Sequence, residues 1–428
     1  MLITVIFFLF ISLAIIAGLV SPSVREFKIA NVNLNSKQSY FLAESGAEDA
    51  LYRTLKNITI SPSETLTLNN NSATTTITTA PLTNDKQIVS LGDVGGLQRK
   101  TSVTLKAGAG IGFNYGVQSG DGGFTLSGGS KITGNVYSNG NIQASSGVQI
   151  TGTAIAAGAT SYIGDGVGSP YMGTVVIGSA GVGDAWAYKV LGGNVAGHLY
   201  CQLPATFPAG NQNNKACDTS KGIPPTQPMP FTDDDITAWK SAGAAGGTIT
   251  GATNCHGGYS GGNCTVDYTG ATFGPGKING NLTVNGGGTL TLTGTVWVVG
   301  TVTVTGGGKI KLPANYALNS ETIISDSLVT INGGGSLGSG NPNSYLFIVS
   351  TSNSSSAISV TGGAGAIAVD AQNGTVALSG AASLNAAVGK TITVTGGTNL
   401  TYQQGLASPS FQSGPSGGWA IGSWGETQ

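Results

Sequence analysis

The sequence predicts a mainly β protein: a long N-terminal α-helix, then a small β subdomain, then a parallel β-helix (solenoid) with a loop-rich, disulfide-containing insertion. Three observations predict this fold. The first 24 residues carry no charge and run directly into a helical pattern. Beyond about residue 57 the chain becomes rich in Gly, Thr, Ser and Asn, with alternating Val, Leu and Ile. Charged residues make up only 9% of the chain, against about 25% in ordinary domains.

The composition also limits the partners. The net charge is −1 over 428 residues and no basic patch occurs, so we expect no nucleic-acid partner. No cofactor is expected either. We place a hydrophobic and amphipathic helix at 1–57, a small β subdomain at 58–110 and the first solenoid coils at 111–158. A loop-rich insertion with the cysteines follows at 159–275, and solenoid with a C-terminal cap at 276–428.

The apolar run 1–24 would form a helix of roughly 36 Å, enough to cross a bilayer. A cleaved secretory signal would begin with basic residues and end at a small-residue cleavage site, and nothing basic precedes the run. Arg25, Lys28 and Lys37 follow it, which by the positive-inside rule would leave the body in the cytoplasm. We therefore expect that Met1 is not the initiator and that a short basic leader has been removed or left out.

The helical pattern continues beyond the apolar run. Phe27, Leu34, Phe41 and Leu51 recur at helical spacing between charged residues, which indicates an amphipathic helix with an apolar stripe for a partner. Pro22 lies inside this helix and should kink or locally unwind it, since it removes a backbone hydrogen bond. The residues expected to pack against other helices are Val5, Phe8, Ile11, Ile15, Pro22, Phe27, Leu34, Phe41 and Leu51.

These residues resemble a known family. The apolar helix, Pro22 near its end and the segment FLAESGAEDALYR (41–53) look like the N-terminus of type IV pilin-like proteins of the minor-pilin type. The resemblance implies a helix that sits in the membrane after leader cleavage and is then packed into a filament core. Major pilins usually have glutamate at the fifth mature position, whereas Val5 stands here. This departure favours a minor, tip or atypical subunit, and a plain membrane anchor is the alternative.

The body repeats short apolar-x-apolar units separated by Gly, Asn and Ser. The rhythm begins near residue 112, returns at 277–312 and continues to about 397. Very short strands, a sustained repeat and turns without two-residue hairpin signals favour a parallel β-helix, with a sandwich or barrel as the alternative. The tail contains Tyr402, Phe411, Trp419 and Trp424, which we expect to cap the open end of the solenoid. From about 229 onward the chain resembles the passenger regions carried by such pilin-like proteins, which implies an exported, non-enzymatic surface module.

The segment 159–275 breaks the rhythm and holds all four cysteines. Cys201 with Cys217, and Cys255 with Cys264, form two locally spaced pairs, for which disulfides are the simplest interpretation in an exported chain. The alternative is a metal site that adds His198 and His256, although no CxxC spacing is present. A short helix is predicted from Asp233 onward, with Thr232 or an aspartate as its cap. The three aspartates at 233–235 could instead bind calcium.

The remaining candidates concern contacts and catalysis. Exposed aromatics in glycine-rich loops suit glycan or protein contacts, or they pack under the loops. β-Helices also host glycan-active enzymes, but the repeats contain few carboxylates and no nucleophile motif. Rows of outward threonines, as at 289–295 and 301–305, make ice binding conceivable. The candidate contact aromatics are Tyr115, Tyr162, Tyr171, Trp186 and Tyr188.

These observations predict a structural role. We expect a minor, tip or atypical subunit of a type IV pilus-like surface filament, anchored in the inner membrane before assembly. Its partners would be identical or related pilin subunits, and its β-helix would contact an unidentified glycan or protein on a surface. The alternative is a membrane-anchored surface adhesin that does not polymerise. A β-helix glycan-active enzyme and an ice-binding protein are the further alternatives.

Overall fold

The structure is a computed structural model. It describes residues 2–55, 60–80, 85–107, 112–145, 147–164, 176–178, 183–191, 194–203, 216–249, 255, 258–316, 319–338, 344–407, 409–411 and 419–427. The chain divides into two compact units. The first, the helix–sheet unit, consists of Met1–Lys106 with Ala420–Gln428, and the second, the solenoid unit, is Ala107–Trp419.

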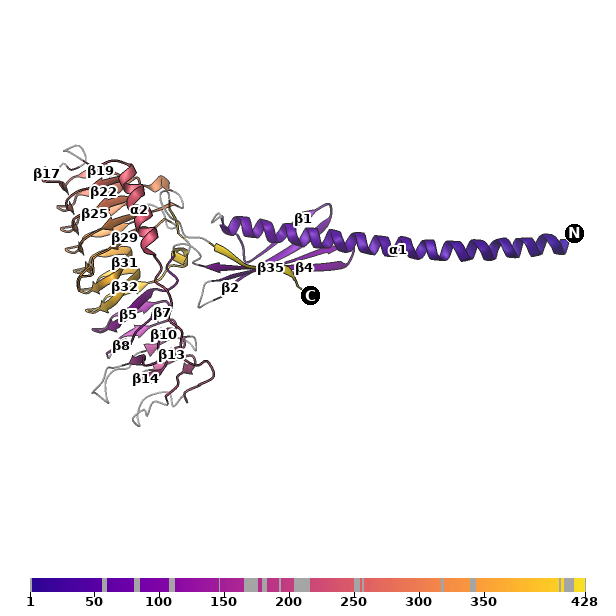
Figure 1. Ribbon diagram of the computed structural model, residues 1–428, viewed down its shortest axis with the longest axis horizontal. Coiled ribbons are helices and arrows are strands. Elements are labelled where there is room, and N and C mark those ends of the chain that lie inside the picture. The colour runs from indigo at the N-terminus through magenta and orange to yellow at the C-terminus, as the bar shows by residue number, and fades with distance from the viewer. Residues whose placement is uncertain are drawn as a thin grey trace. The chain divides into compact units, whose positions relative to one another are not determined.

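The helix–sheet unit is one long helix on a small sheet (Figure 1). Successive strands β1 to β4 pair antiparallel, and the C-terminal strand β35 adds to β4 as the fifth strand. The chain's last strand therefore belongs to the same sheet as its first four. The elements are α1 (Leu2–Leu55), β1 (Ser63–Leu68), β2 (Asn71–Thr79), β3 (Lys86–Val94), β4 (Leu97–Ala107) and β35 (Trp419–Thr427).

Small side chains let α1 lie very close to the sheet. Ala43 and Ala47 are fully buried on the helix. A Cβ built on Gly46 would come within 2.5 Å of the Ser90 hydroxyl, and one on Gly92 within 2.1 Å of a helix carbonyl oxygen. The C-terminal half of α1 is thus held against β2 and β3, with no room for larger side chains at these positions.

The helix runs through Pro22 without interruption, so the expected local unwinding is wrong. Proline removes one hydrogen bond from a ladder that the neighbouring turns maintain on both sides. The described helix extends to Leu55, and residues 56 and 57 of the predicted helix lie outside the described residues. Within the part of the chain that the structure describes, no helix is long and apolar enough to cross a membrane.

The solenoid unit is a large parallel sheet coiled on itself, as the sequence predicts. Each coil contributes short strands to three ladders, which we call A, B and C. Ladder A pairs, in order, β20 (Gly276–Ile278), β23 (Val296–Val298), β26 (Asn319–Ser325), β29 (Leu346–Ser350), β31 (Gly365–Leu378), β32 (Ser383–Val394), β5 (Val117–Leu126), β7 (Val136–Ser138), β10 (Ala154–Ala156), β13 (Ala185–Ala187) and β16 (Leu199–Tyr200).

The long strands β31, β32 and β5 bend and take part in a second ladder as well. Ladder B pairs β18 (Asn263–Val266), β21 (Leu282–Val284), β24 (Val302–Val304), β27 (Val329–Ile331), β30 (Ile358–Val360), the second halves of β31, β32 and β5, then β8 (Ile142–Ala144), β11 (Tyr162–Gly164) and β14 (Lys189–Leu191). Ladder C pairs β19 (Thr269–Phe273), β22 (Thr289–Leu292), β25 (Lys309–Lys311), β28 (Ser336–Gly338), the first residues of β31 and β32, then β33 (Asn399–Thr401), β6 (Lys131–Thr133), β9 (Gln149–Ile150), β12 (Val176–Ile177) and β15 (Asn194–Val195). Two short strands complete the sheet: β17 (Gly258–Ser260) pairs antiparallel with β18, and β34 (Ser410–Phe411) pairs with β26.

Alternation within each strand builds the core. Val302 and Val304 are fully buried, whereas Thr303 between them faces outward and is half-exposed. The next coil repeats this with Val329 and Ile331. Like residues therefore stack on like residues along the axis, which is how a solenoid buries a continuous core.

The chain enters and leaves the solenoid in the middle of the stack. Strand β5, the first of the unit, pairs with β32, one of its last. The amide of Phe113 donates to the carbonyl of Leu406 at 2.7 Å, and the Tyr402 hydroxyl donates to the Phe113 carbonyl at 2.6 Å. Coils run outward from β5 to one end, and the chain then crosses to the opposite end and coils back (Figure 1).

The crossing segment consists of a strap (residues 221–231) and α2 (Asp233–Ala245). Thr232 caps α2, as predicted: its hydroxyl accepts from the Asp235 amide at 3.2 Å, and the Asp235 carboxylate accepts from the Thr232 amide at 2.9 Å. The helix lies against β20, β23 and β26 of ladder A (Figure 1). Strap and helix together cover the outer face of that ladder.

Two sequence expectations about the body are wrong. The insertion is narrower than 159–275, because β11 to β16 and β18 to β20 are ordinary coils; their alanines and glycines hid the rhythm. The tail does not form a solenoid cap. Phe411 packs in the middle coils. Residues 419–427 form β35 of the helix–sheet unit, because the solenoid is inserted between β4 and β35 of one sheet and the chain returns to that sheet after it.

Candidate functional site

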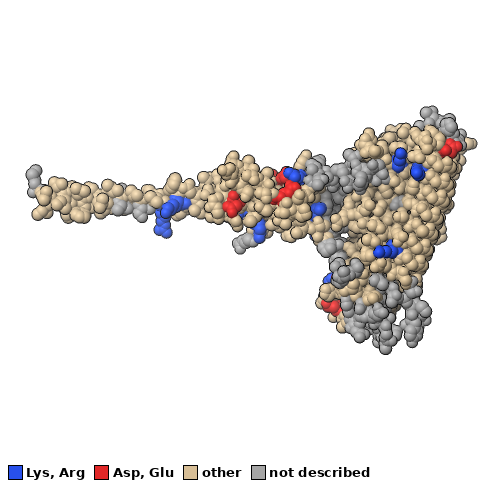
Figure 2. All heavy atoms as spheres, turned by 180° about the vertical axis from the view of Figure 1, so that it is seen from behind, with Lys and Arg blue, Asp and Glu red and all other residues tan. Residues whose placement is uncertain are grey.

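The N-terminal part of α1 presents an apolar surface to solvent. Phe8 is 66% exposed and Phe27 is 67% exposed. Figure 2 shows this stretch of the helix without charged residues until a basic cluster interrupts it. Exposed apolar patches of this size mark surfaces that another protein or a membrane covers. The predicted assembly residues with exposed side chains are Val5, Phe8, Ile11, Ile15, Phe27, Leu34 and Phe41.

Leu51 differs from the other predicted assembly residues. Its side chain is only 9% exposed, so it packs inside its own unit and is not free for a partner. Phe41 lies in the same C-terminal half of α1 but is 61% exposed, and helical spacing alone does not show which side of the helix the sheet covers. A hollow lined by Thr4, Val5, Phe8, Leu9 and Ser12 lies on the free half.

The strap covers several of the predicted contact aromatics. Tyr115 is 3% exposed, and its hydroxyl lies 3.3 Å from the Gln227 side-chain oxygen. The Tyr137 hydroxyl donates to the Pro225 carbonyl. The indole N–H of Trp186 donates to the Gly222 carbonyl at 2.9 Å. Burial raises the pKa of Tyr137 to about 12 and also raises that of Tyr115. These three aromatic side chains hydrogen-bond to the strap and hold it in place, so they do not form a free contact surface.

The other predicted aromatics give a mixed result. Tyr162 and Tyr188 are half-buried in the coils, and Tyr171 lies outside the described residues. Near one end of the solenoid, Lys221 of the strap lies 3.7 Å from the Tyr200 ring centroid and 5.5 Å from that of Trp186. Cation–π contacts of this kind stabilise the strap at its start.

A polar groove that the sequence did not predict lies at the corner between ladders A and B. Its volume is about 630 Å³. The corner residues of successive coils line it, so the signal in the sequence was only Ser and Asn in turns, which turns use anyway. The lining residues are Asp326, Thr351, Ser352, Asn353, Asn373 and Lys390.

In the groove the carboxylate of Asp326 already has partners within the chain, whereas several other polar side chains do not. Lys240 of α2 lies 2.5 Å from Oδ1 of Asp326, and the indole N–H of Trp297 donates to Oδ2 at 2.8 Å. Asn353, Asn373 and Lys390 are exposed and have no side-chain partner among the described residues. The groove therefore offers amide groups and one cation to a ligand.

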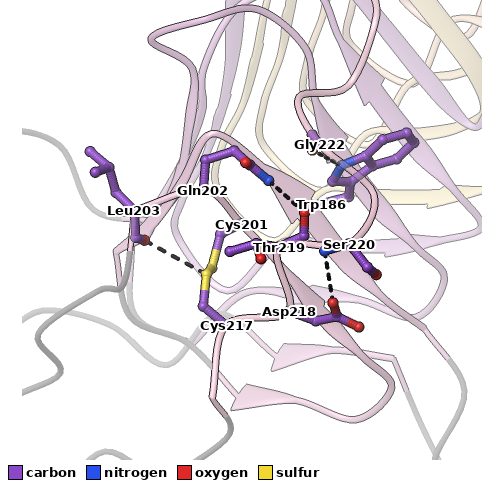
Figure 3. Close-up of a disulfide and its surroundings, with 9 residues drawn as sticks. All are labelled: Trp186, Cys201, Gln202, Leu203, Cys217, Asp218, Thr219, Ser220 and Gly222. Carbon is purple, nitrogen blue, oxygen red and sulfur yellow. Dashed lines mark hydrogen bonds between the residues drawn. A yellow bond between two sulfur atoms is a disulfide. The ribbon is translucent and has the colours of Figure 1, made fainter.

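The cysteines form the two predicted disulfides, Cys201–Cys217 and Cys255–Cys264. Figure 3 shows the first, where the carboxylate of Asp218 accepts from the Ser220 amide and Gln202 donates to the Thr219 carbonyl. Cys201 follows β16 and Cys264 lies in β18, so each disulfide belongs to a terminal coil. Bonded sulfurs are no longer thiolate ligands, which overturns the alternative of a metal site. His256 lies outside the described residues.

Two carboxyl groups are fully buried in the coils. Glu321 accepts hydrogen bonds from the Tyr316 hydroxyl at 2.8 Å and the Thr295 hydroxyl at 3.1 Å. Asp370 accepts one from the Gln372 amide at 2.9 Å, while its Oδ2 has no partner in the part of the chain that the structure describes. Desolvation raises the pKa of Asp370 to about 7. No three metal-ligating side chains gather among the residues that the structure describes.

Comparisons with known proteins give one kind of match. No protein-family model matches the sequence, and no curated protein does. Among solved structures, the competence-associated pilin ComZ from Thermus thermophilus is similar at 15% sequence identity and a TM-score of 0.34. The alignment covers 92% of this chain and 97% of that chain.

Proposed function

We propose that this chain is a structural subunit of a type IV pilus-like filament. In this proposal α1 packs against the helices of identical or related subunits, and the solenoid is displayed on the extracellular surface for attachment. The observation that carries the proposal is the exposed apolar half of α1. A 54-residue helix that is packed only over its second half needs a partner for the first, because large apolar side chains left in water lose their burial energy.

The resemblance at residues 41–53 and the arrangement of the first unit support this proposal. Small residues of the C-terminal half of α1 hold the sheet, while Phe27 and Leu34 on the N-terminal side stay exposed. The C-terminal half of α1 thus packs on its own sheet, and the N-terminal half is available to pack against neighbouring subunits. Residence of the apolar half in the inner membrane before assembly stays a prediction.

The proposed contact site for a surface ligand is the polar groove between ladders A and B. Both oxygens of its carboxylate, Asp326, are engaged by Lys240 and Trp297, which suits binding better than acid–base catalysis. The free amides of Asn353 and Asn373 suit the hydroxyls of a glycan or the backbone of a protein. This supports a binding role for the solenoid over an enzymatic one, which activity measurements on a glycan panel would test.

Assembly can be tested on the full chain by replacing Val5 with Asp. A buried charge without a partner is costly, so we expect fibres to be lost from the surface fraction of expressing cells, as seen by electron microscopy. The matched control is Val299→Asp, which places the same charge at a partly exposed apolar position of the solenoid unit.

The outcomes separate the two candidate functions. Loss of fibres in Val5→Asp, with fibres kept in Val299→Asp, supports assembly through α1. Fibres that persist in Val5→Asp overturn it. A wild-type chain that stays in the membrane fraction as single particles supports the alternative, a surface adhesin that does not polymerise.

A further inference from the structure

The outer face of ladder B carries a column of hydroxyl side chains in register. Thr283 pairs with Thr303, which pairs with Thr330 on the next coil. The middle residue of each strand faces outward and is half-exposed, whereas the residues on either side of it are buried. The column continues through the pairings of neighbouring coils. From the β18 end it reads Thr265, Thr283, Thr303, Thr330, Ser359, Ala377, Thr393, Thr125 and Gln143, and it continues to Gly164 and Leu191 on the last two coils.

A second column runs beside the first, two residues further along each strand. The ladder bonding extends to it, since the Thr305 amide donates to the Val284 carbonyl at 2.9 Å and the Thr395 amide to the Leu378 carbonyl at 2.9 Å. The second column takes the first position after each strand, as Asn285 follows β21 and Thr305 follows β24. Residues two apart in an extended chain point to the same side, so both columns border one face. The second column reads Asn285, Thr305, Asn332, Thr361, Ser379, Thr395, Ser127 and Ser145.

The geometry of these columns is fixed by the fold. Coils repeat about 4.7–4.9 Å apart along the axis, and the columns lie roughly 6.6 Å apart along the strand. Threonine is β-branched and stiff at χ1, so each hydroxyl and methyl is held in a defined direction. The hydroxyls of Thr283, Thr303 and Thr330 have no hydrogen-bond partner among the described residues. They form a regular array of groups that are free to bind something outside the chain.

The face lacks charge in a way that the rest of the solenoid does not. Lys309 and Lys311 face outward from ladder C and are exposed, and Lys131 repeats this on a later coil. Asp267 on the end coil continues the second column and is charged, whereas the other residues named in the two columns are uncharged. A face needed only for solubility would carry charges of both signs, so its neutrality needs another explanation.

We infer that this face binds the surface of an ice crystal. Regularly spaced hydroxyls and methyls can hold a layer of water at intervals close to those of an ice plane, whereas charged side chains would reorient that water. The absence of aromatic residues from both columns disfavours a sugar surface, because sugar rings are bound by stacking on aromatic side chains. Ice binding thus goes beyond filament assembly, and it would serve a filament as a means of attachment to ice.

The test uses the purified full chain in detergent micelles and measures inhibition of ice recrystallisation, with binding of labelled protein to an ice surface as a second readout. We expect inhibition by the wild type. For the variant with Thr303→Lys and Thr330→Lys, the concentration needed should rise by about tenfold or more, the equivalent of about 1.4 kcal/mol. The control is Thr401→Lys on ladder C, which introduces the same charge at an exposed outward position.

Further variants keep the test decisive. Thr303→Val retains the shape and removes the hydroxyl, and it should weaken inhibition without lowering the Tm. If the double lysine variant fails to fold by circular dichroism, Thr303→Val alone decides. A wild type that neither inhibits recrystallisation nor binds ice overturns the inference. Binding to crystalline cellulose or chitin, lost in the lysine variant, without any effect on ice would overturn it in favour of a polysaccharide surface.

Discussion

Nη2 of Arg99 donates a hydrogen bond of 2.7 Å to Oε2 of Glu426, a residue 327 positions later in the chain. Nη1 of Arg99 also donates to the Ser36 hydroxyl of α1 at 3.2 Å. One guanidinium therefore links the helix, β4 and the final strand β35. The small sheet is complete only after the whole solenoid has been synthesised.

This linkage predicts that β35 matters through its backbone more than through its ion pair. Glu426→Gln should change the free energy of unfolding little, since both side chains are exposed by more than a third and solvent screens the ion pair. Deletion of residues 419–428 should leave β4 as an open edge and lower the Tm of the first unit, with increased aggregation in light scattering. An unchanged Tm after the deletion would show that four strands suffice.

A second prediction concerns the close contact of helix and sheet. A Cβ on Gly92 would lie 2.1 Å from the Ser39 carbonyl oxygen and 2.7 Å from the Ala43 amide nitrogen. Gly92→Ala should therefore push α1 from β3 and destabilise the unit by about 1–3 kcal/mol. Gly425→Ala is the matched control, because no atom of the described residues lies within 4 Å of the Cβ there. The Tm of both variants is measured by thermal unfolding. Equal Tm values would contradict the expectation.

A third prediction concerns the aromatic cluster where the chain enters and leaves the solenoid. Trp239 of α2 packs 5.0 Å from Phe231 and 5.0 Å from Phe411 between ring centroids, and Phe347 lies 5.1 Å from Phe411. Trp239→Ala should cost about 3–5 kcal/mol. Trp239→Phe should cost much less, because the buried indole N–H has no hydrogen-bond partner among the described residues. The free energies of unfolding of the two variants are compared by denaturant unfolding. Equal losses of stability in both variants would mean that the indole N–H has a hydrogen-bond partner.

A fourth prediction follows from the buried carboxyl of Asp370. Its pKa is raised from 3.8 to about 7 in the folded state, so the folded chain holds a proton that the unfolded chain releases. Stability should thus be highest below pH 4 with respect to this group and fall as the pH rises toward 7. Asp370→Asn should remove this dependence and stabilise the protein at pH 8 by on the order of 1 to 4 kcal/mol.

The measurement for Asp370 is urea unfolding of both proteins at several pH values. The two curves should converge near pH 4 and separate between pH 4 and 7. Asp121→Asn, at an exposed carboxylate, is the control and should follow the wild type. A constant difference between wild type and Asp370→Asn over this range would mean that Asp370 does not titrate there.

The repeat could be predicted because one residue type recurs at one place in every coil. Val302 and Val304 around Thr303 reveal a strand with one buried face, and the glycine pair Gly306 and Gly307, with φ of 57° and 76°, reveals the turn. Local sequence also revealed the cap at Thr232. Each of these features depends on neighbours a few positions away.

The remaining features depend on distant partners. Nothing in the sequence around Trp419 indicates that it joins β4, or that β5 pairs with β32, since those pairings connect opposite ends of the chain. For the same reason, the sequence left open whether Tyr115 is exposed or packed under a loop. The polar groove arises from Asp326, Asn353 and Lys390, which are far apart in sequence and meet only because successive coils stack.

The position of β5 beside β32 has one more consequence. The chain enters and leaves the solenoid at neighbouring central coils. Whole coils could therefore be gained or lost at either tip without any shift of the two segments that connect the solenoid to the helix–sheet unit. Relatives of this protein could therefore carry longer or shorter solenoids, with coils duplicated or lost at the tips while the two connecting segments stay constant.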